Sequence, residues 1–143
     1  MTRALAAPDV TTHPRHDDTI LLVEDDPDLR DVLADILRDA GRSVVEAEDG
    51  EDALAKLETN ERPCLILLDL LMPRMDGFEF LERLKARRDA PELPVLVISA
   101  HSRATAAEHY PGVLGTLRKP FEVEVLLSWV NERCSELPAP RHA

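Results

Sequence analysis

Short apolar runs alternate with amphipathic stretches along the middle of this chain. Each run is about five residues long and rich in Val, Ile and Leu, which is typical of strands that are buried on both faces. The runs lie at residues 19–23, 43–47, 64–68, 94–99 and 112–117. We therefore expect five strands.

The stretch after the first run has the pattern of a helix and a signal at each end. Asp26 provides an N-cap and Pro27 occupies the first helical position, apolar residues then recur at helical spacing as far as Ala40, and Gly41 follows. Similar stretches follow the other runs at residues 50–58, 77–88, 102–110 and 121–136, the one at 102–110 being the weakest. Five successive strand–helix units predict an α/β fold, with a parallel sheet covered by helices on both faces.

Length and composition fit one folded domain. The chain has 143 residues, of which 44% are apolar, and this is enough to bury a single core. We assign that domain to residues 19–136, because residues 1–18 and 137–143 carry prolines and little hydrophobic pattern. Both ends are interpreted as flexible tails.

Net charge and cysteine content narrow the possible partners and the cellular location of the protein. Acidic residues outnumber Lys and Arg by 28 to 17, giving a net charge of −11, which argues against direct binding of nucleic acid. Cys64 and Cys134 are interpreted as reduced thiols of a cytoplasmic protein. No apolar run approaches the roughly 20 residues that span a bilayer, and no signal peptide is recognisable, so we expect a cytoplasmic protein without membrane insertion.

Candidate functional residues follow the predicted strands. Glu24 and Asp25 come directly after the first strand, Asp69 after the third, Ser99 closes the fourth, and Lys119 follows the fifth. Because parallel α/β sheets bind ligands at the carboxyl ends of their strands, we expect these groups to converge. Each one taken alone is more often a helix cap, an ion-pair partner or a solvated surface charge.

Asp69 is harder to explain as a surface charge, because an apolar strand delivers it to the edge of the sheet. A carboxylate there would be desolvated unless a cation accompanied it. Mg²⁺ suits such a place, since it takes oxygen ligands and is usually held by one or two carboxylates together with phosphate oxygens. A carboxylate with Mg²⁺, a lysine and a hydroxyl nearby favours phosphoryl chemistry.

At this point the chain resembles a known family. The segments "ILLVEDD", "LILLDLLMPRMDG", "VLVISA" and "LRKPF" stand in the order and at nearly the spacing of the receiver domain of response regulators in two-component signalling. The resemblance extends from about residue 19 to residue 136 and implies a flavodoxin-like, doubly wound (βα)5 fold with strand order 2-1-3-4-5. It implies a stand-alone receiver similar to the chemotaxis regulators.

The resemblance also implies roles for the strand-end residues. Asp69 would be the phosphoacceptor. It would attack the phosphorus atom of a phosphohistidine on a sensor kinase and form an acyl phosphate. Asp25 and Asp69 would bind Mg²⁺ directly, the backbone carbonyl of Leu71 would add a ligand, and Glu24 would act through water. This register leaves Asp26 as an N-cap.

The remaining members of the implied site are Ser99, as the hydroxyl that contacts the phosphoryl group, and Lys119, as the amine that does so. The Lys119-Pro120 bond is expected to be cis. The partners implied are a sensor histidine kinase or a histidine phosphotransfer protein, and a downstream protein target reached through protein contacts. The protein is expected to catalyse its own phosphorylation and dephosphorylation and not to be a metabolic enzyme.

Two departures from the family pattern bear on signalling. Thr116 occupies the position, three residues before the lysine, where many receivers carry Tyr or Phe. The fourth helix is expected to be a couple of residues shorter than usual, ending at Tyr110 and Pro111. His101, two residues after Ser99, lies where members of the family tune the lifetime of the phosphorylated form.

Three alternatives stay open to different degrees. A phosphatase of the haloacid-dehalogenase type needs a second Asp two residues after the nucleophile, but residue 71 is Leu. A receiver-like binding module that is never phosphorylated usually lacks the acceptor, the acidic pair or the lysine, and all of these are present. A phosphorelay intermediate or phosphate sink would use the same residues, and the sequence does not distinguish it from a terminal switch.

Overall fold

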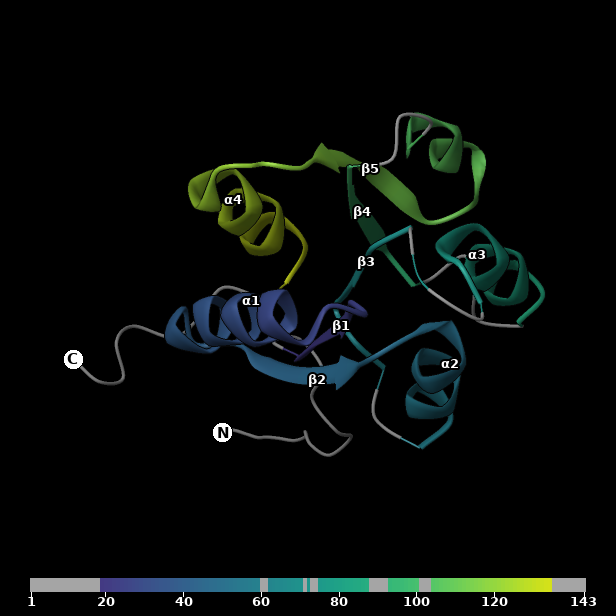
Figure 1. The fold of residues 1–143 in the computed structure, drawn as a ribbon, viewed down its shortest axis with the longest axis horizontal. Coiled ribbons are helices and arrows are strands. Elements are labelled where there is room, and N and C mark those ends of the chain that lie inside the picture. The colour runs from purple at the N-terminus through teal and green to yellow at the C-terminus, as the bar shows by residue number, and fades with distance from the viewer. Residues whose placement is uncertain are drawn as a thin grey trace, which may run out of the picture.

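The fold is known from a computed structural model that describes residues 19–59, 62–70, 72, 75–87, 93–100 and 104–134. Within these ranges one parallel sheet contains five strands in the order β2-β1-β3-β4-β5 (Figure 1). The predicted class and strand order are confirmed. The strands are β1 Thr19–Val23, β2 Ser43–Ala47, β3 Leu65–Leu68, β4 Val95–Ser99 and β5 Val113–Arg118. Two match the predicted ranges, and three differ by one residue at one or both ends.

Helices connect the strands as the sequence predicted. They are α1 Pro27–Asp39, α2 Gly50–Thr59, α3 Gly77–Lys85, the 3₁₀ helix η2 Ala104–His109, and α4 Val123–Arg133. α1 begins where the Asp26–Pro27 signal indicated, because the Asp26 side chain accepts hydrogen bonds from the backbone N–H groups of Asp28 and Leu29. No helix among the described residues combines the length and the apolar character needed to cross a membrane.

The helices cover both faces of the sheet. α1 and α4 lie on one face, and α2 and α3 lie on the other (Figure 1). Side chains of each strand alternate between the two resulting cores: Ile66 and Leu68 pack on the side of α2 and α3, whereas Leu65 and Leu67 pack on the side of α1 and α4. All four of these strand residues are fully buried. This double burial explains why the strands read as continuous apolar runs.

The element between β4 and β5 is a 3₁₀ helix where an α-helix was expected. Its described residues are Ala104–His109, and 3₁₀ geometry is frequent in short connecting segments. Pro111 follows and Gly112 takes a positive φ of 87°, so the chain cannot continue helically into β5. η2 therefore ends directly before Tyr110 and Pro111, where the sequence predicted an end, and its length relative to other receivers stays a prediction.

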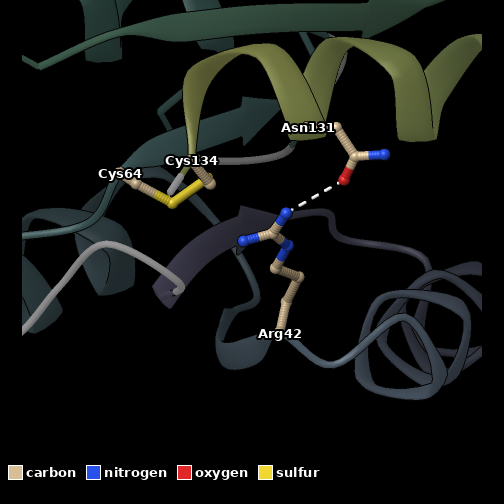
Figure 2. The surroundings of a disulfide bond; sticks show 4 residues. All are labelled: Arg42, Cys64, Asn131 and Cys134. Carbon is tan, nitrogen blue, oxygen red and sulfur yellow. Dashed lines mark hydrogen bonds between the residues drawn. A yellow bond between two sulfur atoms is a disulfide. The ribbon is translucent and has the colours of Figure 1, made fainter. Parts of the chain in front are cut away.

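The two cysteines form a disulfide, so the expectation of two reduced thiols is wrong for this structure (Figure 2). Cys64 directly precedes β3 and Cys134 directly follows α4. The fold places the start of β3 beside the end of α4, which brings the two Cα atoms to 5.2 Å, a normal separation for a disulfide. Their 70-residue separation in sequence gave no local signal of the pairing.

Candidate functional site

Three carboxylates meet at the carboxyl ends of β1 and β3. The register pairs Val23 with Leu68, so the residues that follow these two strands leave the sheet at the same level. Each of Glu24, Asp25 and Asp69 offers an oxygen, and these oxygens lie within 4.8 Å of one another. Glu24 is 1% exposed and Asp69 is 5% exposed. The sequence-predicted acidic pair and Asp69 are thus brought together in a largely desolvated place.

Backbone hydrogen bonds fix the acidic residues in the sheet. The N–H of Glu24 donates to the carbonyl of Ala47 at 3.1 Å, and the N–H of Asp69 donates to the carbonyl of Val23 at 3.1 Å. Arg30, from α1, donates through Nη1 to the carbonyl oxygen of Glu24 at 2.7 Å. Both carboxylates therefore project from ordered ends of strands. Arg30 was missed by sequence reasoning, since an arginine in a helix carries no sign of which carbonyl it will reach.

Lys119 supplies the positive charge in the cluster. Its Nζ lies 3.3 Å from Glu24 Oε1 and 3.3 Å from Asp69 Oδ2. The backbone N–H of Lys119 donates to the carbonyl of Ser99 at 3.1 Å, which extends the pairing of β4 with β5 to the edge of the site. The Lys119–Pro120 peptide bond is cis, as the resemblance implied. The ammonium group of Lys119 therefore lies next to the Asp69 carboxylate.

The electrostatics of the cluster are unfavourable without a further cation. Burial, followed by the nearby negative charge of Asp69, raises the pKa of Glu24 from 4.5 to about 7, although Lys119 and a hydrogen bond from the Asp26 backbone oppose this change. Desolvation alone would lower the pKa of Lys119, but attraction to Asp69 and Glu24 raises it on balance. Among the residues that the structure describes, these three carboxylates thus lie around the ammonium group of Lys119.

The donor set fits a hard divalent cation. Three carboxylates that converge within 4.8 Å offer oxygen ligands only, which is the chemistry that Mg²⁺ selects. A divalent charge would also offset the repulsion that raises the pKa of Glu24. The residues present therefore fit the metal that the resemblance implied.

Ser99 lies at the same edge of the sheet. It is the last residue of β4, is fully buried, and ends the strand next to β3. Asp26, by contrast, is exposed and caps α1, with Oδ1 accepting a hydrogen bond from Asp28 N at 3.0 Å. This geometry agrees with the sequence interpretation of Asp26 as an N-cap rather than a member of the acidic pair. Leu71 and His101 lie outside the described residues.

Gly77 lies very close to the backbone of Asp69 and Leu70. A Cβ atom on Gly77 would come within 2.5 Å of Leu70 Cα and 2.9 Å of the Asp69 carbonyl oxygen. The Gly77 N–H also donates to the Leu70 carbonyl at 2.9 Å. Only glycine allows the start of α3 to approach the backbone so closely. The motif "MPRMDG" signalled a turn here, but not this contact.

The sequence model of the response regulator receiver domain matches residues 20–131 of this chain. The chain therefore belongs to the response regulator receiver domain family. Receiver domains are phosphoacceptors of two-component signalling rather than metabolic enzymes, and they bind Mg²⁺ at an acidic pocket. They interact with histidine kinases and with downstream targets.

Several relatives are similar over most of this chain. An uncharacterized 14.6 kDa protein of Leptolyngbya boryana is 36% identical over 121 residues, covering 83% of this chain and 92% of that protein. The nitrogen assimilation regulatory protein NtrX of Azorhizobium caulinodans is 38% identical over 121 residues, covering 82% of this chain and 26% of NtrX. The DNA-binding transcriptional regulator NtrC of Klebsiella pneumoniae is 36% identical over 127 residues, and 26% of its length is matched. This chain thus spans about a quarter of those two regulators.

Solved structures show the same fold. The chemotaxis protein CheY4 of Vibrio cholerae aligns with a TM-score of 0.72 and 32% identity over 80% of this chain and 97% of CheY4. The response regulator TrrA of Thermotoga maritima, solved in complex with Mg²⁺ and BeF, aligns with a TM-score of 0.71 and 25% identity over 80% of this chain and 97% of TrrA. These similarities support the flavodoxin-like assignment.

Proposed function

We propose that this protein accepts a phosphoryl group on Asp69 from a phosphohistidine of a sensor histidine kinase or a histidine phosphotransfer protein. The observation that carries the proposal is the position of the Asp69 carboxylate. It is nearly buried, lies 3.3 Å from the Lys119 ammonium group, and converges with Glu24 and Asp25 within 4.8 Å. Membership of the receiver family supports the same reaction.

In the proposed reaction, a carboxylate oxygen of Asp69 attacks the phosphorus atom. The bond between phosphorus and the histidine nitrogen breaks, the imidazole leaves, and an acyl phosphate remains on Asp69. Lys119 pairs with the anionic oxygens of the group, and the Ser99 hydroxyl donates a hydrogen bond to one of them. Asp25 and Asp69 would hold Mg²⁺ directly, the Leu71 carbonyl would be a further ligand, and Glu24 would act through water. When bound, the metal neutralises charge on the phosphoryl oxygens.

We further propose that the protein works in the cytoplasm and signals to a downstream protein through protein contacts, without binding nucleic acid itself. The net charge of −11 supports the last point, because a surface with excess carboxylates repels phosphate backbones. The DNA-binding activity named for NtrC belongs to a protein of which this chain matches only 26%.

Acetyl phosphate provides the test, since it is a small phosphoryl donor that needs no cognate kinase. The wild type with Mg²⁺ should gain the mass of one phosphoryl group, and the same protein with a chelator should gain none. Asp69→Asn should stay unmodified, whereas Asp26→Asn, which keeps a capping side chain next to the site, should be modified like the wild type. Modification of Asp69→Asn to the wild-type extent would overturn the proposal.

A further inference from the structure

The C-terminal end of α4 is attached to the rest of the molecule at two neighbouring points. Cys134, which follows the helix, is bonded to Cys64 at the start of β3. Asn131, in the last turn, accepts a hydrogen bond through Oδ1 from Arg42 Nη2 at 2.9 Å. Figure 2 shows both attachments together, with the Arg42 side chain extending toward α4 in the surroundings of the disulfide. One attachment is a covalent bond, and the other is a hydrogen bond.

This attachment lies at the opposite end of the sheet from the acidic cluster. Cys64 precedes β3, whereas Asp69 follows it. The covalent loop that the disulfide closes, from residue 64 to residue 134, contains Asp69, Ser99 and Lys119. α4 therefore connects the two ends: its first residue, Val123, comes shortly after Lys119, and its end is held by the disulfide.

The two cysteines of the disulfide differ in burial. Cys64 is partly buried, whereas Cys134 is 5% exposed, so we expect an external thiol to approach from the side of Cys64. Attack at Cys64 would release Cys134 as a thiolate. The buried Arg42 side chain lies in the same surroundings (Figure 2), and a nearby positive charge favours a thiolate, which leaves more readily than a thiol.

We propose that Cys64 and Cys134 form a reversible redox pair that controls how firmly the end of α4 is attached to the sheet. In the reduced state both residues are thiols. Oxidised glutathione, or a protein disulfide of the same class, is attacked by one thiolate to give a mixed disulfide, which the second thiolate resolves. The pair loses two electrons and two protons, one S–S bond forms in the protein, and the oxidant's S–S bond is cleaved to two thiols.

The location proposed for the protein favours a reversible pair over a permanent one. Disulfides in cytoplasmic proteins are usually transient or redox-sensing, because the thiol pool keeps cysteines reduced. The redox pair also goes beyond phosphoryl transfer, since neither cysteine lies in the acidic cluster. It can therefore be tested in the unphosphorylated protein.

α4 carries a built-in reporter of its own attachment. Trp129 is the only tryptophan in the chain, and its ring packs on β5, where a Cβ on Gly115 would lie 2.9 Å from the ring atom Cη2. Tryptophan fluorescence therefore comes from α4 alone and is sensitive to the packing of this helix against β5. Opening the disulfide should loosen the helix and change the emission of Trp129.

The first measurement equilibrates the protein with a series of ratios of reduced to oxidised glutathione and counts thiols by alkylation and mass spectrometry. The proposal predicts a change from no free thiols to two within the series. A protein that remains a disulfide at every ratio, including excess reduced glutathione, would have a structural bond, and one that remains a dithiol at every ratio would have no pair. Either result would overturn the proposal.

The second measurement follows Trp129 emission and amide hydrogen exchange over the same series. Emission should change with the same midpoint as the thiol count, exchange should accelerate in the last turn of α4, and amides of β1 should be unaffected. The midpoint of thermal unfolding should fall on reduction by roughly 10 °C, the order expected for a disulfide that closes a long loop. Thiol formation without any change at Trp129 or in the last turn of α4 would also overturn the proposal.

Two variants control the interpretation. Cys64→Ser combined with Cys134→Ser should give the reduced emission at every glutathione ratio, and if it fails to fold, the reduced wild type supplies that reference. Asn131→Ala removes the second attachment and leaves the cysteines intact. Reduction should then accelerate exchange in the last turn of α4 more than it does in the wild type, because this variant has also lost the hydrogen bond from Arg42.

Discussion

Thr116 donates a hydrogen bond from Oγ1 to Oε2 of Glu108 at a distance of 2.7 Å. The bond joins β5, three residues before Lys119, to the 3₁₀ helix η2. Many receivers carry an aromatic side chain at this position, whose inward rotation reports phosphorylation. Here Thr116 has a small hydroxyl side chain that is hydrogen-bonded to η2, so a change at the proposed phosphoacceptor Asp69 must reach η2 without the rotation of an aromatic ring.

The first prediction concerns that route. Binding of BeF₃⁻ with Mg²⁺, which mimics the acyl phosphate, should draw Ser99 and Lys119 toward Asp69 and move the chain that follows β4 and β5. Amide NMR shifts should concentrate at the ends of β1, β3, β4 and β5 and in residues 100–118. α1 should move little beyond its first turn. Shifts limited to Asp69 and its immediate neighbours would instead indicate a phosphoryl carrier or sink.

The second prediction isolates the hydrogen bond itself. Thr116→Val keeps the shape of the side chain but removes the donor to Glu108, so the BeF₃⁻-induced shifts in η2 should become smaller. Because the bond is exposed, the free energy of unfolding should fall by no more than about 1 kcal/mol. Thr105→Val, an exposed threonine of η2 itself, is the matched control and should leave the shifts unchanged. Equal effects of the two substitutions would rule out a special role for Thr116.

The third prediction distinguishes Asp25, the proposed metal ligand, from its neighbour Asp26. Asp25→Asn should weaken Mg²⁺ binding and slow phosphorylation, because it removes a charge from the convergent cluster. Asp26→Asn should bind Mg²⁺ like the wild type, and Asp26→Ala should lower the free energy of unfolding by about 1 kcal/mol through loss of the helix cap. If titration showed that Asp26→Asn weakened the metal as much as Asp25→Asn, the assigned register would be wrong.

The fourth prediction follows from the raised pKa of Glu24. Its value of about 7 in the folded protein exceeds the usual 4.5, so the folded state binds this proton more tightly than the unfolded state does. The stability of the metal-free protein should therefore fall as the pH rises from about 4.5 to about 7. Glu24→Gln should remove this fall and stabilise the metal-free protein near neutral pH, on the order of 1–3 kcal/mol.

Denaturant unfolding in the presence of a chelator measures this effect, with Mg²⁺ addition as the comparison. The wild type should gain more stability from Mg²⁺ than Glu24→Gln does, because only the wild type carries the negative charge of Glu24, which the metal would offset. A metal-free Glu24→Gln variant that is less stable than the wild type at neutral pH would contradict the proposed repulsion.

The fifth prediction concerns the close approach at Gly77. Gly77→Ala would force its Cβ against the backbone of Leu70 and Asp69, and backbone cannot move aside cheaply. We expect a loss of about 1–3 kcal/mol in the free energy of unfolding, together with weaker Mg²⁺ binding. Gly50→Ala is the control, since its Cβ would meet the Met75 side chain and, at 3.1 Å, the Met75 carbonyl oxygen, and the atoms closest to it do not belong to Leu70 or Asp69. Mg²⁺ affinity should fall in Gly77→Ala and stay near the wild-type value in Gly50→Ala.

The sheet and most of the site could be predicted from the sequence for a physical reason. A parallel strand buried on both faces must be apolar throughout, so runs such as residues 65–68 are visible without any structure, and the polar residue that ends each run marks the functional edge. The pairing of Cys64 with Cys134 and the bond from Thr116 to Glu108 were not predictable. The disulfide depends on how the completed fold places two segments that are distant in sequence. The hydrogen bond depends on how the fold places the 3₁₀ helix η2 beside β5.

The position of the acyl phosphate can be read directly by chemical trapping. The wild-type protein is treated with acetyl phosphate and Mg²⁺ and then reduced with borohydride, which converts an aspartyl phosphate into homoserine. Peptide mass spectrometry then locates the converted residue. We predict homoserine at position 69 and at no other aspartate. Conversion at Asp25 or Asp26, or none at all in protein that has gained a phosphoryl group, would contradict the assignment of Asp69 as the phosphoacceptor.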